Sequence, residues 1–188
     1  MSVVVGVKKN DSIVLATDSF RHLGSSRFAP EIVNTSKVSR IANTLFGVAG
    51  WSVYHYILRD YAKRQKFSQF ANEHDVYQFF QGLWDELQQG RFGFVNHQCN
   101  SESSPFVDLD SSFLIATDAG IYTVTADLCV LSCERYWAIG VGSDFAFGAM
   151  YYLYDREDSA DRIAEMGVRA AIQFCTHCGG ESIIHRLR

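Results

Sequence analysis

The chain has 188 residues, of which 47% are hydrophobic, a proportion that suits one globular domain with a substantial core. Aromatic residues make up 14% and only two prolines are present, so the composition argues against disorder. The formal net charge is -4 and no lysine- or arginine-rich stripe occurs, which argues against nucleic-acid binding. We therefore expect a single acidic domain over residues 1–188.

The first apolar run does not resemble a secretory signal. Val3–Val7 is short, and Lys8 and Lys9 follow it instead of preceding it. No stretch approaches the roughly 20 apolar residues that a membrane helix needs. These features predict a cytoplasmic protein that does not enter a membrane.

The first half of the chain predicts strands followed by two helices. Val3–Val7 and Ile13–Ala16 are aliphatic runs separated by Asn10-Asp11, which is a turn signal at hairpin spacing. Leu45–Gly50 predicts a strand that ends in glycines. Helical periodicity then covers about 52–67, where one face carries Val53, Ile57, Leu58 and Tyr61. A second helix has apolar residues at three- and four-residue steps: Val76, Phe79, Phe80, Leu83, Trp84 and Leu87.

From Gln89 to about Asp110 the sequence is polar and irregular, which predicts a long loop that is either a surface excursion or a functional lip. Strands are predicted next, at Phe113–Ala116 and Ile121–Thr125 around an Asp118-Ala119-Gly120 hairpin turn, then at 129–131 and 137–139.

The last third predicts two helices and a final strand. Ser143 is the predicted N-cap of a helix that continues to Leu153, and another helix begins near Ser159 and ends near Phe174. Ile183–Leu187 is the last predicted strand. Strand groups followed by helix pairs, twice over, predict an α+β fold in which two antiparallel sheets stack and helices cover both outer faces, a four-layer αββα sandwich.

Ser2 directly precedes the first strand. If Met1 is removed, Ser2 carries a hydroxyl and a free α-amine on one residue, which together supply a nucleophile and a nearby base. Serine at position 2 is small enough for ordinary methionine removal. The alternative is a processed serine with no chemical role.

The five cysteines fit reduced thiols better than a disulfide framework. Cys129 with Cys133, and Cys175 with Cys178, form two close pairs that together offer four thiolates for a tetrahedral zinc. The alternative is that they are small buried hydrophobic residues. We expect packed thiols and no metal or cofactor, with a zinc-binding interaction module as the remaining alternative.

Several motifs, in order, resemble those of proteasome-type N-terminal nucleophile hydrolases, among them the HslV-type peptidases and, more closely, the small bacterial proteasome homologues (BPH). They are the opening segment from Ser2 to Asn10, Ile13–Asp18, Ser36–Ile41, Gly47–Gly50, and Trp137–Ser143 followed by Phe147–Tyr151. The resemblance spans nearly the whole chain, and it is the order and spacing of the motifs that make it specific.

This resemblance implies a catalytic set. Ser2 would be the nucleophile, with its own α-amine as proton acceptor. Lys37 would favour the deprotonated forms by its charge, Asp18 would hold Lys37, and Gly47 would offer its backbone N–H to the oxyanion. Taken singly, Asp18 is also compatible with a strand end, Lys37 with a solvated lysine and Gly47 with a bend.

The chain departs from the family pattern at four positions. Ser2 stands where the family nucleophile is usually threonine, and Val141 stands where a serine commonly supports the amine. Cys175 and Cys178 stand where the proteasome pattern has an aspartate and a serine or threonine, although HslV-type chains also carry cysteine at the first of these. An impaired enzyme is therefore an alternative.

The resemblance implies a peptidase that cleaves polypeptides inside a homo-oligomeric double ring of six- or seven-membered rings. An ATPase partner is not identified by the sequence. A non-catalytic ring subunit is the alternative from another class, and an intact Met1 would favour it.

Overall fold

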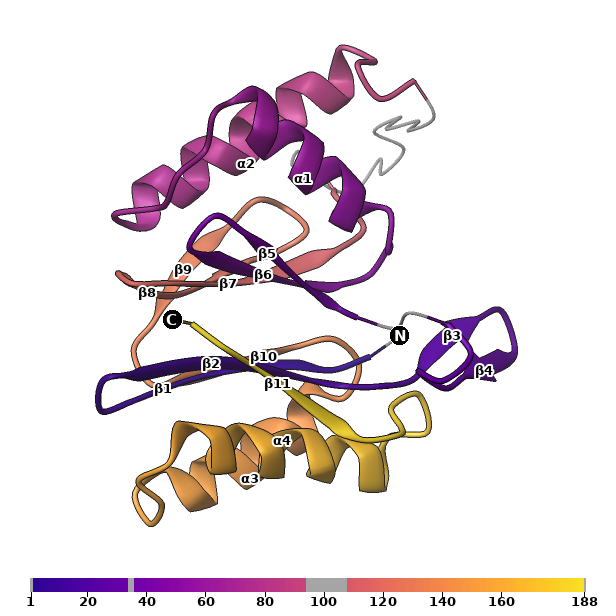
Figure 1. The fold of residues 1–188 in the computed structure, drawn as a ribbon, viewed down its shortest axis with the longest axis vertical. Helices are drawn as coiled ribbons and strands as arrows, with labels where there is room; N and C mark the ends of the chain where they lie inside the picture. Colours follow the sequence, from indigo (N-terminus) through magenta and orange to yellow (C-terminus); the bar gives the residue numbers. More distant parts are fainter. Residues whose placement is uncertain (1, 34–35, 94–107, 188) are drawn as a thin grey trace.

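The computed structural model describes residues 2–33, 36–93 and 108–187, arranged in four layers (Figure 1). Helices α1 (Tyr54–Arg64) and α2 (Glu73–Gln88) cover the outer face of one sheet. Helices α3 (Ser143–Tyr154) and α4 (Ala160–Phe174) cover the outer face of the other. The αββα sandwich predicted from the order of strands and helices is confirmed.

Both sheets of the sandwich are antiparallel. The four-stranded sheet has the order β10-β1-β2-β11, with bounds Tyr136–Ile139, Val4–Lys9, Ser12–Asp18 and Ser182–Arg186. The five-stranded sheet runs β5 to β9 in sequence order, with bounds Val38–Ile41, Thr44–Ala49, Ser112–Thr117, Gly120–Val124 and Val130–Cys133. A small separate hairpin pairs β3 (Arg21–Leu23) with β4 (Ser26–Phe28).

The two predicted hairpin turns are confirmed. Lys9 pairs with Ser12, so Asn10 and Asp11 form the two-residue connection between β1 and β2, and Asn10 has the positive φ that such turns require. Thr117 pairs with Gly120 across the equivalent connection between β7 and β8.

Alternation along the strands divides the core into three parts. On β1, Val5 packs under α3 and α4, whereas its neighbour Val4 faces the other sheet. On β6, Phe46 packs under α1 and α2, whereas Leu45 lies between the sheets. Because successive side chains of a strand point to opposite faces, each sheet contributes side chains to two of the three cores. The first strand is therefore packed on both of its faces.

Side chains define two of the helix starts. The Asn72 side chain accepts a hydrogen bond from the backbone N–H of Asp75 at 3.1 Å, and the Ser159 side chain accepts one from Arg162 at 3.2 Å. The prediction that Ser143 is an N-cap is wrong, because Gly142 holds the cap position without a side-chain hydrogen bond and α3 begins at Ser143. A side chain at Gly142 would lie 2.7 Å from Cys178 Sγ, so the close packing there requires glycine.

Three short strands, β3, β4 and β5, are additional to the strands predicted. Of the polar segment predicted between Gln89 and Asp110, residues 94–107 lie outside the described residues. In the described part of the chain, no helix is long and apolar enough to cross a membrane.

Candidate active site

Asp18, the last residue of β2, is fully buried and joins three segments of the chain. Its Oδ1 accepts hydrogen bonds from the Val3 backbone N–H at 3.0 Å and from Lys37 Nζ at 2.5 Å. Its Oδ2 accepts one from the Gly179 backbone N–H at 3.1 Å. Buried charge is unfavourable unless it is paired and hydrogen-bonded. Here donors from the segments that precede β1, β5 and β11 compensate one carboxylate.

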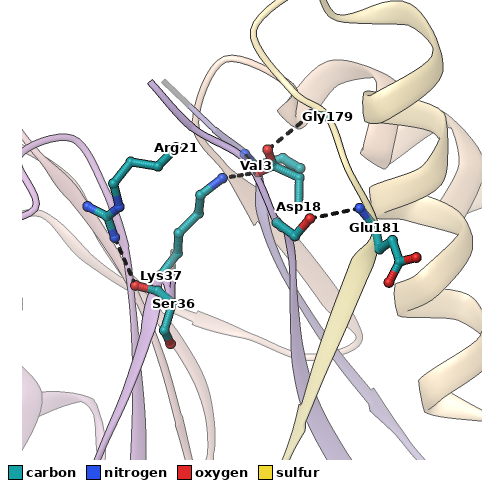
Figure 2. Close-up of polar contacts among 8 residues, drawn as sticks. Val3, Asp18, Arg21, Ser36, Lys37, Gly179 and Glu181 are labelled. Carbon is teal, nitrogen blue, oxygen red and sulfur yellow. Dashed lines mark hydrogen bonds and ion pairs between the residues drawn. The ribbon is translucent and has the colours of Figure 1, made fainter. Parts of the chain in front are cut away.

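Lys37 immediately precedes β5, and Figure 2 shows its side chain extending to Asp18. The residue is 6% exposed. Burial lowers the pKa of Lys37 below its ordinary value, and the charge and hydrogen bond of Asp18 partly offset this effect, whereas Arg21 adds to it. The Lys37 ammonium therefore releases its proton more readily than a lysine in water does.

Ser2 directly precedes β1 and is buried. The peptide that follows it is tied to the ion pair, because the Val3 N–H and Lys37 Nζ bind the same oxygen of Asp18. The Ser2 carbonyl packs against Gly140, where φ is +92° and a side-chain carbon would overlap that oxygen. The structure thus brings together Ser2, Asp18 and Lys37, which lie far apart in the sequence.

Gly47 does not fit its predicted role. It lies inside β6, between β5 and β7, and the N–H of the next residue, Val48, donates to the Lys37 carbonyl at 3.0 Å. Since successive N–H groups along a strand point to opposite neighbours, the Gly47 N–H faces β7 within the ladder. A Cβ at Gly47 would lie 2.6 Å from Val4 Cγ1. The prediction that the Gly47 N–H binds the oxyanion is therefore corrected: this N–H faces the neighbouring strand, and the glycine allows the two sheets to approach.

Gly50 is the better candidate for the oxyanion donor. It follows the last residue of β6, is exposed and has φ +140°. Its N–H has no acceptor among the described residues, whereas the N–H of Trp51 donates to the Ser111 hydroxyl at 2.9 Å. The preceding Ala49 packs beside Gly140, at the Ser2 carbonyl. Sequence reasoning identified the glycine pair in this segment, but not which member lies at the strand end.

The positions that depart from the family pattern lie around this site. Val141 is half-exposed and carries no hydrogen-bonding side chain, and Cys175 Sγ lies 3.8 Å from its carbonyl oxygen. Burial, reinforced by the charge of Asp18, raises the pKa of the Cys178 thiol, so this thiol stays protonated. At position 178, a thiol, which is a weak hydrogen-bonding group, therefore lies near the Lys37–Asp18 pair.

The structure does not bring the two cysteine pairs into one cluster. Cys133 packs between the sheets, whereas Cys178 packs under α3 and α4; Cys129 and Cys175 are exposed and partly buried free thiols. Among the described residues, no group of three or more histidine, cysteine, aspartate or glutamate side chains is arranged to hold a metal ion. Cys99 lies outside the described residues.

No model of a known protein family matches the sequence, and no curated protein matches it. Solved structures do match. BPH from Thiobacillus denitrificans superposes with a TM-score of 0.83 at 24% identity, covering 99% of this chain and 98% of that one. The same protein in complex with epoxomicin gives 0.82 at 24% identity, covering 99% of both chains. HslV from the eukaryote Trypanosoma brucei gives 0.69 at 17% identity, again covering 99% of both.

The chain has the proteasome-type N-terminal nucleophile hydrolase fold. The resemblance inferred from short motifs is confirmed at the level of the fold. The stacking of the two sheets brings the start of β1, which Ser2 directly precedes, beside the end of β2 and the start of β5. That position explains how Ser2 comes to lie next to a lysine and an aspartate.

Proposed function

We propose that the chain hydrolyses peptide bonds through an acyl-enzyme on Ser2, after removal of Met1. The observation that carries this proposal is the buried Lys37–Asp18 pair, one oxygen of which also binds the peptide that follows Ser2. A buried ion pair contributes little stability compared with apolar residues of the same volume, so its position beside a potential nucleophile favours a chemical role. The structural likeness to a bacterial proteasome homologue and to HslV supports it.

In the proposed reaction, Ser2 Oγ attacks the carbonyl carbon of the scissile peptide bond and its proton passes to the α-amine of Ser2. The tetrahedral oxyanion accepts a hydrogen bond from the Gly50 N–H. The C–N bond then breaks, the leaving amine takes the proton, and an ester remains on Ser2. Water that gives its proton to the α-amine attacks this ester, which releases the acid and restores Ser2.

Lys37 acts in this scheme through its charge. A free α-amine has a pKa near 8, and a neighbouring ammonium favours its neutral form, which is the form that accepts a proton. Asp18 holds Lys37 in place and also accepts hydrogen bonds from two backbone N–H groups. The pair therefore keeps its geometry as charge develops on Ser2.

We further propose that residues 1–188 act as one domain within a cytoplasmic double ring of six- or seven-membered rings and cleave polypeptides there. A non-catalytic ring subunit is the second candidate, and Val141 favours it. Its apolar side chain stands where the family pattern has a serine that supports the amine.

Replacement of the nucleophile tests the proposal. Protein whose intact mass shows that it begins at Ser2 should hydrolyse fluorogenic peptide amides. Ser2→Ala should keep the fold and lose at least about a hundredfold in kcat, because no oxygen remains to attack. Ser12→Ala, which alters an exposed serine at the start of β2, is the matched control.

The two candidate functions differ in a second measurement. Because the structurally similar BPH was solved with epoxomicin, we expect epoxomicin to inhibit the processed wild-type protein and to leave no bound species on Ser2→Ala. Absence of both turnover and binding in protein lacking Met1 would reject catalysis and support the non-catalytic subunit.

A further inference from the structure

A polar cavity of about 510 Å³ lies between β5 and α1, beside the candidate active site. Its lining includes three arginines that come from three different elements: Arg21 from β3, Arg40 from β5 and Arg59 from α1. The hydroxyl of Ser52 and the ring of His55 also line it.

The cavity adjoins the residues assigned to the chemistry. Ser36 and Val38, the two neighbours of Lys37 in the sequence, both line it. Ser52, another lining residue, is two positions beyond Gly50. Figure 2 shows Arg21 beside Ser36 and Lys37. A substrate whose carbonyl lies between Ser2 and the Gly50 N–H would therefore place the side chain of that same residue at the cavity.

The charge of this cavity is uncompensated. Among the described residues, no aspartate or glutamate lines it, and none of its three arginines forms an ion pair. Arg21 donates to the Ser52 hydroxyl and, at 3.1 Å, to the Ser36 carbonyl, while its buried Nε has no hydrogen-bond partner among the described residues. Among the described residues, the Arg40 side chain donates only to the backbone carbonyl of Arg186 on β11, so its guanidinium points towards the other sheet.

A neighbouring titratable group is affected by the same charges. The pKa of His55 is lowered to about 4, first by burial and then by Arg21 and Arg59. His55 is therefore neutral near pH 7, and the net positive charge of the cavity comes from the guanidinium groups. Guanidinium groups bind carboxylates through paired, charge-assisted hydrogen bonds.

We propose that this cavity binds the carboxylate side chain of a substrate residue, aspartate or glutamate, whose own carbonyl Ser2 attacks. The inference deepens the proposed function and rests on it for the identity of the ligand as a substrate. Arg59 and Arg21 supply the positive charge, and the Ser52 hydroxyl lies within reach of the same carboxylate.

Two peptide amides that differ only at that residue, glutamate against glutamine, test the preference. Wild-type protein should cleave the glutamate peptide with a kcat/KM about tenfold or more above that of the glutamine peptide, as expected for one charged hydrogen bond. Arg59→Gln should lower this ratio at least fivefold. Lys63→Gln removes the same charge from the same helix outside the cavity, so it should leave the ratio unchanged.

A binding measurement separates failure of this inference from failure of catalysis. Calorimetry on Ser2→Ala protein compares N-acetyl-Ala-Ala-Glu with N-acetyl-Ala-Ala-Gln, neither of which needs to be cleaved. Tighter binding of the glutamate peptide that is lost in Ser2→Ala/Arg59→Gln supports the acidic site even if the wild-type protein cleaves nothing. Equal binding of the two peptides, or equal cleavage by an active enzyme, overturns the proposal.

Discussion

At the candidate site, the two members of the buried ion pair depend on each other unequally. Without Lys37, Asp18 would keep the N–H donors of Val3 and Gly179. Without Asp18, the Lys37 ammonium would lose the one acceptor that it has among the described residues. Because loss of a partner leaves an uncompensated buried charge, removal of the carboxylate should be the more harmful change.

We therefore expect Asp18→Asn to lower the free energy of unfolding by about 3–5 kcal/mol, and Lys37→Met by less. Urea unfolding monitored by circular dichroism measures both. Glu165→Gln, which breaks two exposed pairs on α4, is the control and should cost less than about 1 kcal/mol. An Asp18→Asn protein as stable as Glu165→Gln would contradict the unequal dependence.

His55 makes stability depend on pH in a defined direction. Its pKa is about 4 in the folded protein, against about 6.5 when unfolded, and its Nδ1 lies 2.9 Å from the Ser39 hydroxyl. Between these values the unfolded chain binds the extra proton. The folded state thus has its full advantage above pH 6.5 and loses it as the pH falls towards 4.

The full difference between the two pKa values corresponds to about 3 kcal/mol of unfolding free energy. We expect a smaller effect, because the ring is only partly buried. Unfolding free energies at pH 7 and pH 4.5 should therefore differ more for the wild-type protein than for His55→Gln. His185 also has its pKa lowered, by burial and by Arg40, so part of the pH dependence should remain in the variant. Identical pH profiles for the two proteins would rule out this role of His55.

At the scale of elements, the spacing between the sheets depends on Gly47. In β6 its neighbours Leu45 and Ala49 point into the core between the sheets, and Gly47 shares that face opposite Val4 of β1. A methyl group at Gly47 would press on Val4 in a closely packed core, where added volume typically destabilises by about 1–3 kcal/mol.

Gly47→Ala should accordingly lower the free energy of unfolding by about 1–3 kcal/mol. Adding Val4→Ala should recover part of that loss, because it removes the methyl groups in the way, so the two changes should be non-additive in urea unfolding. Gly148→Ala on α3 meets no neighbouring atom and should stabilise by up to about 1 kcal/mol. Strictly additive effects of the two substitutions on the free energy of unfolding would contradict a direct clash between a side chain at position 47 and Val4.

The sequence patterns predict some of these strands and helices and miss others. Continuous aliphatic runs bounded by turn residues located β1, β2, β7 and β8, because these strands are buried on both faces. Apolar residues at three- and four-residue steps located α2, because that helix buries one face. β5 was not predicted as a strand: it is a four-residue edge strand in which Arg40 is exposed, so its apolar pattern is too short to read.

Long-range contacts limited the prediction of the site. Asp18 and Lys37 are 19 positions apart, and their pairing depends on the stacking of two sheets, which local patterns do not encode. Only the family resemblance predicts that these two residues act together. The oxyanion donor was assigned to Gly47 instead of Gly50 for the same reason. Only the pairing of β6 with its neighbours shows which backbone N–H is already hydrogen-bonded within the sheet.

At the scale of the whole molecule, the outer helix layer of α3 and α4 is unusually aromatic. Phe145 and Phe174 have ring centroids 5.9 Å apart and are 42% and 68% exposed. Tyr152, seven residues after Phe145 and so on the same side of α3, is 61% exposed. Soluble monomers rarely expose large apolar patches, and aromatic residues are favoured at interfaces. This surface is a suitable contact for a second copy of the chain in the proposed rings.

The wild-type protein should therefore elute as an oligomer many times the 21.2 kDa of one chain, as measured by light scattering after gel filtration. Phe174→Glu and Tyr152→Glu should each shift it towards smaller species, because a charge on this face opposes its burial. Circular dichroism should stay unchanged, since both side chains are exposed in the single chain. Tyr77→Glu alters a 41% exposed aromatic residue on α2, in the opposite helix layer, and is the matched control. If wild-type protein is a monomer at micromolar concentration, or if Tyr77→Glu dissociates it as fully as Phe174→Glu, the α3–α4 face is not the main contact between copies.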